Sequence, residues 1–149
     1  MSGCLVRLGE QVALIVGDSG SGKTDCLLEL ADRGHQVLAD DAVEWRGGGQ
    51  GMEWRCPEAL QGLLAVRGLG LVRCPPVAGG PVTVDLAIEL VRPDRTEWSG
   101  WPALEPVWTR VAIGPGLDLA ALRLPVAPGR PLALLVEQAV RAHAAGPAP

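Results

Sequence analysis

The stretch GDSGSGKT, residues 17–24, places three glycines, two serines, a lysine and a threonine directly after the apolar run VALIV. Lys23 is the only lysine of the chain, and the other twelve of its 13 basic residues are arginines. A strand, then GxxxxGK[ST], then a helix is typical of a loop whose backbone N–H groups cradle phosphates. An ammonium on a flexible stem fits among phosphate oxygens where a planar guanidinium does not, which explains a lone lysine at this position.

These residues predict a nucleotide site in which the glycines let the backbone approach the phosphates. Lys23 is expected to reach the β- and γ-phosphates of ATP, and Thr24 to place its hydroxyl on Mg²⁺. A chance match in a glycine-rich chain is the alternative, and the flanking strand and helix patterns argue against it. The predicted nucleotide-binding residues are Gly17, Asp18, Ser19, Gly20, Ser21, Gly22, Lys23 and Thr24.

A pair of carboxylates, Asp40 and Asp41, ends the apolar run of QVLADD. A strand beside the phosphate-loop strand would deliver both acids next to the metal and the phosphates. Since neighbouring residues of a strand point to opposite sides, one acid can face the metal and the other the acceptor. A solvated turn with two aspartates is the alternative. Asp85 is a rival metal-side acid, although its alternating surroundings favour an ordinary half-exposed strand.

The composition bounds the class of protein. With 149 residues, 48% of them hydrophobic, the chain is long enough for one domain with a real core. A net charge of −4 and scattered arginines give no footprint for nucleic acid or an anionic membrane. No apolar run reaches the length of about 18 residues that a membrane span needs. Four distant cysteines without a CxxC pattern indicate reduced thiols in a cytoplasmic protein.

Hydrophobic periodicity and the positions of glycine and proline predict one α/β domain over residues 1–149, with a frayed tail at 145–149. No internal repeat or linker interrupts it. The expected elements are two strands within 4–17, a helix over 22–34, a strand and hairpin over 35–56 with its tip at 47–51, a short helix over 57–68, strands over 68–74 and 81–91, an excursion over 92–106, and a helix from about Pro131.

Four segments, taken in order and spacing, resemble the C-terminal catalytic domain of the HPr kinase/phosphorylase family. They are GDSGSGKT, LLELADRGHQVLADDAVE, LLAVRGLGLV and LPVAPGRPLALLVEQAV. The resemblance implies an α/β P-loop kinase fold related to that of the phosphoenolpyruvate carboxykinases. It also implies a Mg-dependent, ATP-dependent serine kinase that phosphorylates an HPr-like phosphocarrier protein, with a regulatory role in the phosphotransferase system.

The resemblance assigns further roles to single residues. The family's general base maps onto Asp40, and Asp41 takes the metal-side position. The family's PV-x-x-GR segment maps onto 125–130, where Arg130 is expected to supply charge stabilisation near the active site, also toward a neighbouring subunit. Family members assemble as hexamers through this domain, so a homo-oligomer is expected.

Two departures from the family pattern stand out. The family's active-site histidine falls on Ser2, and a glutamate associated with Mg²⁺ falls on Ala65. These losses argue against phosphorylase activity and leave nucleotide binding untouched. The chain otherwise looks like the short, single-domain type of the family. Two alternatives stay open: a nucleotide-binding regulatory module that no longer transfers phosphate, and a kinase of another hydroxyl.

The remaining polar candidates have ordinary explanations. His35 is expected to be structural and His143 solvated. Arg67 could contact phosphate or hold its own loop. The tryptophans at 98, 101 and 108 are expected in packing or in an interface.

Overall fold

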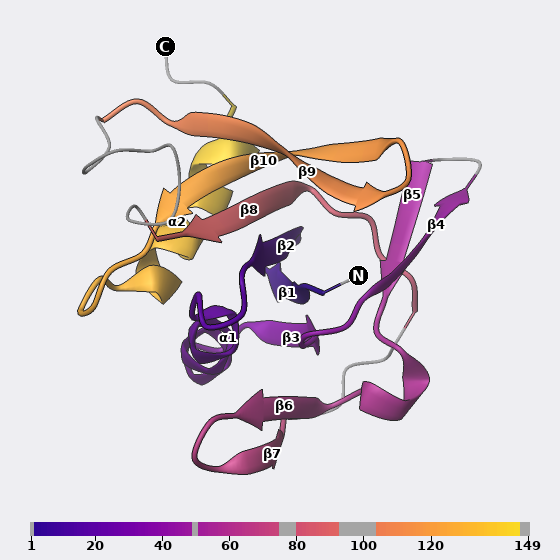
Figure 1. The fold of residues 1–149 in the computed structure, drawn as a ribbon, viewed down its shortest axis with the longest axis vertical. Coiled ribbons are helices and arrows are strands. Elements are labelled where there is room, and N and C mark those ends of the chain that lie inside the picture. The colour runs from indigo at the N-terminus through magenta and orange to yellow at the C-terminus, as the bar shows by residue number, and fades with distance from the viewer. Residues whose placement is uncertain (1, 49–50, 75–79, 93–103, 147–149) are drawn as a thin grey trace.

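A six-stranded mixed sheet forms the centre of the computed structural model, which describes residues 2–48, 51–74, 80–92 and 104–146 (Figure 1). Its strand order is β3-β1-β2-β8-β10-β9. The pairing registers make β2, β3, β8 and β10 run in one direction and β1 and β9 in the other. The strands are β1 (Cys4–Leu8), β2 (Gln11–Gly17), β3 (Gln36–Ala39), β8 (Leu86–Val91), β9 (Val107–Gly114) and β10 (Leu117–Pro125).

Two helices, α1 (Lys23–Asp32) and α2 (Leu132–Ala144), cover one face of this sheet. Both carry an apolar stripe with helical spacing, and its side chains pack on β1, β2 and β8. Leu27 and Leu30 of α1 and Val136 of α2 are fully buried in this layer. The helix that follows the phosphate-loop motif is thereby fixed on the sheet, with its amino end at the edge where β2 ends.

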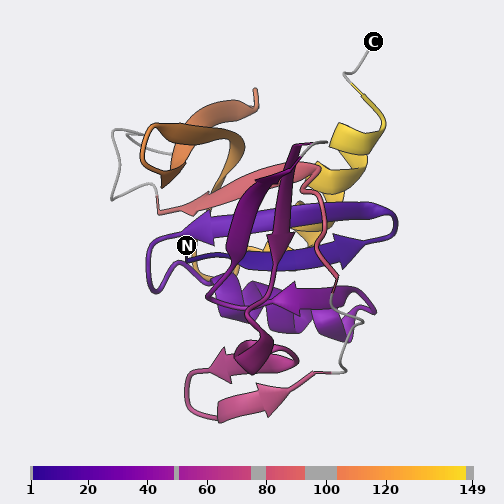
Figure 2. The same ribbon diagram turned by 90° about the vertical axis from the view of Figure 1, so that its right-hand side faces the viewer.

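The opposite face of the sheet is covered by the hairpin of β4 (Glu44–Gly48) and β5 (Gly51–Arg55), which stands across β1 and β2 in Figure 2. Trp54 is buried in this second core, and the centroid of its ring lies 6.3 Å from that of Trp45. The indole N–H of Trp45 donates to the carbonyl of Ile113 at 3.1 Å, which ties the hairpin to β9. A Cβ on Gly114 would lie 2.9 Å from the Trp45 ring, so this close contact requires glycine.

A second hairpin, β6 (Leu63–Val66) and β7 (Gly70–Arg73), packs beside α1 at the bottom of Figure 1. The short helix predicted over 57–68 is therefore wrong beyond its first turn, a 3₁₀-helix at Glu58–Leu60. Leu64 and Val66 are buried while Ala65 is exposed, so the segment has the alternation of a strand. Gly62, at φ 74°, turns the backbone between the 3₁₀-helix and β6.

Most other predicted elements are confirmed. The strand predicted over 81–91 is regular only from Leu86, and Val82 instead forms an isolated bridge with Trp54. The long strands β9 and β10 were not predicted. Most of the expected excursion, with Trp98 and Trp101, and the end of the expected tail lie outside the described residues. No helix within the described part of the chain is long and apolar enough to cross a bilayer.

Candidate functional site

The predicted chemistry gathers at one edge of the sheet, because β2, β3, β8 and β10 all end there. The phosphate loop follows β2, the aspartate pair follows β3, and Arg92 follows β8. Ser2, just before β1, is bridged to Ala42 at the same edge. Ligands of open α/β sheets bind in the crevice outside these carboxyl ends.

The phosphate loop is held in shape by its glycines. A Cβ on Gly17 would lie 2.7 Å from both the carbonyl oxygen of Leu90 and the hydroxyl of Ser21, so no other residue fits there without a shift. Gly22, at φ 98°, sits in the left-handed region and caps α1. The ammonium of Lys23 donates to the carbonyls of Gly17 (2.6 Å) and Asp18 (3.1 Å), across its own loop.

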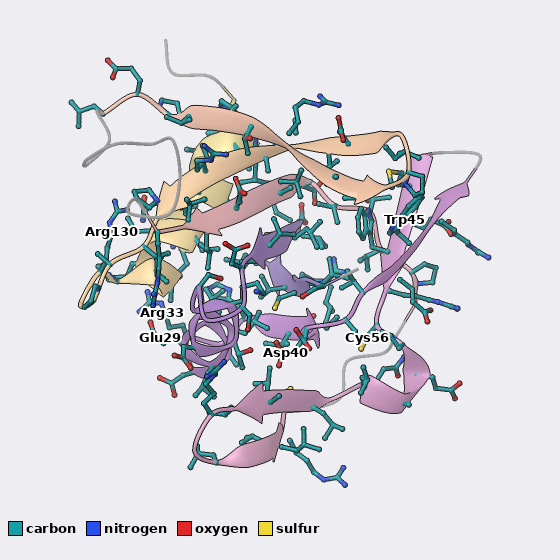
Figure 3. The ribbon with its side chains drawn as sticks, viewed as in Figure 1. Glu29, Arg33, Asp40, Trp45, Cys56 and Arg130 are labelled. Carbon is teal, nitrogen blue, oxygen red and sulfur yellow. The ribbon has the colours of Figure 1, made fainter. Side chains whose placement is uncertain are left out.

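Asp40 is buried, and both of its carboxylate oxygens accept hydrogen bonds from the protein. Oδ1 lies 3.1 Å from the Thr24 hydroxyl and 3.3 Å from the Cys4 thiol, and Oδ2 lies 3.0 Å from the backbone N of Ala65. Figure 3 shows Asp40 at the end of β3, facing the β6–β7 hairpin. Burial, with the Asp40 charge adding to it, raises the pKa of Cys4 to about 12, so this thiol stays protonated and donates.

Asp41 is exposed and adopts a φ of 65°, the one positive φ among the described non-glycine residues. The N–H of Ala42 donates to the carbonyl of Asp40 at 2.7 Å, so Asp41 is the centre of a tight γ-turn. The Ser2 hydroxyl lies 3.4 Å from its Oδ1. Strained backbone of this kind costs about 1–3 kcal/mol and is concentrated at functional sites.

A cleft of about 530 Å³ joins the loop to this turn. Lys23, Thr24 and Asp41 line it, which brings together the groups expected for phosphoryl transfer. Ser2 and Ala65, the two departures from the family pattern, face the same cleft. Arg67 and Arg92 add positive charge to its wall.

Arg92 was not singled out from the sequence. Its position directly after the apolar run LAIELV is the signal that could have identified it, since strand β8 ends there beside the phosphate loop. Arg130 does not line the cleft that holds Asp41. It belongs to the loop between β10 and α2 (Figure 3), where its guanidinium donates to the carbonyl of Pro125 at 2.5 Å.

The other candidates lie away from the cleft. Asp85 is at the opposite end of β8, where its carboxylate accepts from the N–H of Val12 at 2.7 Å, so it is no rival to the acid pair. His35 is structural as predicted, with Nε2 3.0 Å from Glu137 of α2. Arg33 donates to the same carboxylate at 2.5 Å, and its hydrogen bond, followed by that of His35, lowers the pKa of Glu137.

Known proteins of one family resemble this chain over almost its whole length. The model of the HPr Serine kinase C-terminal domain matches residues 1–147. The chain belongs to this family. Its α/β fold is that of the family's P-loop kinase domain, as expected: the structure of the Hpr(Ser) kinase/phosphatase from Coxiella burnetii superposes with a TM-score of 0.81 and 28% identity, covering 97% of this chain and 90% of that one.

Curated relatives in the family are longer than this chain. The HPr kinase/phosphorylase of Ralstonia pickettii is 41% identical over 147 residues, which are 95% of this chain and 44% of the relative. That of Burkholderia cenocepacia is 43% identical over 134 residues, 86% of this chain and 40% of the relative. The chain thus spans less than half the length of these relatives.

Proposed function

We propose that the chain transfers the terminal phosphate of Mg-ATP to a serine hydroxyl of an HPr-like phosphocarrier protein. The observation that carries the proposal is the contact between the Thr24 hydroxyl and Asp40 beside Lys23, with Asp41 in the same cleft. Family membership supports the same reading. Residues 17–24 bind the phosphates, and Lys23 exchanges its loop carbonyls for phosphate oxygens.

The roles of the two acids are the reverse of those that the family resemblance implies: Asp40 is on the metal side and Asp41 is the general base. Asp40 is buried, and its oxygens already accept from Thr24 and from the backbone of Ala65, so it holds the metal side. Asp41 is exposed in the cleft, where an acceptor hydroxyl can approach its carboxylate. Asp41 therefore orients the acceptor and takes its proton.

Oxygen ligands of the kind that Mg²⁺ prefers are present at this place. A hydroxyl and a carboxylate 3.1 Å apart fit an ion that takes one or two protein oxygens and completes its shell with phosphates and water. When bound with the nucleotide, Mg²⁺ neutralises negative charge on the phosphate oxygens. Thr24 would hold it directly, and Asp40 would fix the Thr24 hydroxyl.

The test is the mass of an HPr-like carrier after incubation with the purified chain and Mg-ATP. One added phosphate on a carrier serine is expected, and it should be lost in Lys23→Ala. Arg73→Ala is the matched control, because Arg73 is an exposed cation on β7 that does not line the cleft. An unmodified carrier would contradict the proposal.

A second candidate is a nucleotide-binding module that regulates without transferring phosphate. Its specific support is that Ser2 and Ala65 both face the cleft at the positions of two family working groups. It requires Lys23-dependent binding of Mg-ATP without a phosphoprotein. A kinase of a different hydroxyl would behave in the same way toward the carrier and would be recognised by phosphate transfer to another acceptor.

The proposal extends to assembly and surroundings. Leu69 and Leu71 of the β6–β7 hairpin are 73% and 70% exposed, which supports a homo-oligomer such as a hexamer. Free cysteines, three of them buried, fit a reducing cytoplasm, and a regulatory role in the phosphotransferase system follows from the acceptor. Light scattering of the purified chain tests the oligomer: a monomer at all concentrations would contradict it.

A further inference from the structure

A second cavity, of about 680 Å³, borders the phosphate loop on the side away from the aspartate pair. Its walls are the phosphate loop, the first turns of α1, Arg92 and the loop that follows β10. In the sheet, β3 with the acids and β10 lie on opposite sides of β2. The phosphate loop therefore separates two cavities, one that Asp41 lines and one that neither Asp40 nor Asp41 lines.

The wall formed by the loop after β10 is mainly apolar and contains a hydrogen-bonded turn. Ala127 to Arg130 make a turn in which the N–H of Arg130 donates to the carbonyl of Ala127 at 3.1 Å. Pro128 and Gly129, the latter at φ 80°, occupy the two central positions that a type II turn favours for these residues. Leu132, the first residue of α2, continues this wall, and a Cβ on Gly22 would lie 3.5 Å from it.

Two arginines, Arg92 and Arg130, and two carboxylates of α1, Asp25 and Glu29, also line this cavity. Arg92 lines both the 530 Å³ cleft and the 680 Å³ cavity, so it stands at their junction. Arg130 lines the 680 Å³ cavity but not the 530 Å³ cleft. A cavity of this size with one apolar wall and a few charged groups has the chemistry of a small-molecule site.

The direction of the phosphate donor follows from the position of the acids. The phosphate that is transferred must lie in the cleft with Asp41, and the acceptor must occupy the rest of that cleft. The other end of the donor then has to leave the phosphate loop toward β8 and β10. We propose that the 680 Å³ cavity binds the base and ribose of the nucleoside triphosphate, with Ala127, Pro128 and Leu132 against the base and Arg92 on the phosphate chain.

This inference rests on the proposed nucleotide site, and binding without turnover tests it. Calorimetry compares Mg-ATP with Mg-tripolyphosphate, which has the phosphates but no nucleoside. Ala127→Trp places a large ring in the cavity, and it should weaken ATP binding roughly tenfold, since stacking of a base is worth that order of affinity. Tripolyphosphate affinity should stay within about twofold of wild type, because the phosphate loop is unchanged.

Controls separate this effect from a general disturbance. Ala142→Trp adds the same ring on an exposed position of α2 and should change neither affinity. Arg92→Ala should weaken both ligands, by roughly tenfold or more for a lost charged hydrogen bond. Arg73→Ala, an exposed arginine that lines neither cavity, is its matched control.

A photoreactive donor locates the base even where Ala127→Trp disturbs folding. With 8-azido-ATP, cross-linked peptides should come from residues 126–132 in wild type. Label at residues 2–3 or 65–67 would overturn the inference, as would Ala127→Trp that is folded and binds ATP as tightly as wild type. Both results leave a Lys23-dependent nucleotide site intact, whereas a wild type that binds neither ATP nor tripolyphosphate overturns the site and the inference together.

Discussion

The hydroxyl of Thr24 donates to Oδ1 of Asp40 across 3.1 Å. Thr24 lies in the first turn of α1 and Asp40 directly follows β3, so this bond joins two elements through residues that are 16 positions apart in the chain. It fixes the hydroxyl at the phosphate loop and leaves Asp41, the next residue, to turn into the cleft.

Removal of this hydroxyl should weaken Mg-nucleotide binding. Thr24→Val keeps the shape of the side chain but leaves Asp40 with one donor fewer, and it should lower Mg-ATP affinity by roughly tenfold or more. Titration calorimetry measures the loss. Thr24→Ser, which retains the hydroxyl, should bind within a few-fold of wild type, and equal losses in the two variants would refute a role for the hydroxyl.

Asparagine in place of each acid should separate their roles. Asp40→Asn should raise KM for Mg-ATP together with a loss of kcat, because the metal side is disturbed. Asp41→Asn should lower kcat by about 10²–10⁴, the usual contribution of a general base, with KM for Mg-ATP nearly unchanged. Steady-state kinetics distinguish the two patterns. Transfer by Asp41→Asn at the wild-type rate would remove Asp41 from the mechanism.

The phosphate loop and the acid pair could be predicted from the sequence because their residues are adjacent and their elements are periodic. The division of labour that we propose between Asp40 and Asp41 could not. It depends on the γ-turn at Asp41 and on donors from Cys4 and Ala65, which are distant in the chain. A strand-end rule places neighbouring side chains on opposite sides but does not say which side faces the acceptor.

Errors in the predicted elements have a related cause. Leu63–Val66 follows a proline and a short helical turn, so local propensity suggested a helix, while the apolar side of α1 provides a surface for alternating residues. Packing against α1, rather than local propensity, therefore makes this segment a strand. Strand β9 alternates exposed and half-buried residues, so its pattern is weak without its partner β10.

A methyl group at Gly17 should damage the phosphate loop. Gly17→Ala would bring its Cβ to 2.7 Å from the carbonyl oxygen of Leu90, a backbone atom that cannot move alone. We expect a loss of about 1–3 kcal/mol of unfolding free energy and weaker nucleotide binding. Urea unfolding and calorimetry measure both. Gly47→Ala, where the added methyl meets nothing within 4 Å, is the control, and equal behaviour of the two variants would contradict the account.

The contacts of Arg33 and His35, which follow α1, with Glu137 of α2 should make the stability of the fold depend on pH. The hydrogen bond from Arg33, then that from His35, lowers the pKa of Glu137 below its ordinary value of 4.5. A carboxyl with a lowered pKa in the folded state stabilises the fold above the unfolded-state pKa, and this contribution is lost as pH falls through the folded-state pKa. Glu137→Gln should therefore be less stable than wild type at pH 7.

The expected difference is about 1–2 kcal/mol at pH 7, at the lower end for a charged hydrogen bond because the Arg33 side chain is 44% exposed. It should shrink as pH falls below 4.5, where the wild-type carboxyl takes up its proton. Chemical unfolding at a series of pH values measures it. A difference that is constant from pH 7 down to the acid limit would show that Glu137 acts by shape alone.

The most direct test of the central claim is the mass of an HPr-like carrier after incubation with Mg-ATP and wild-type, Lys23→Ala or Asp41→Asn protein. We expect one phosphate on a carrier serine with wild type, none with Lys23→Ala, and strongly slowed transfer with Asp41→Asn. A carrier that stays unmodified, while wild type binds Mg-ATP through Lys23, would contradict phosphorylation of an HPr-like carrier and favour the regulatory module or a kinase of another hydroxyl.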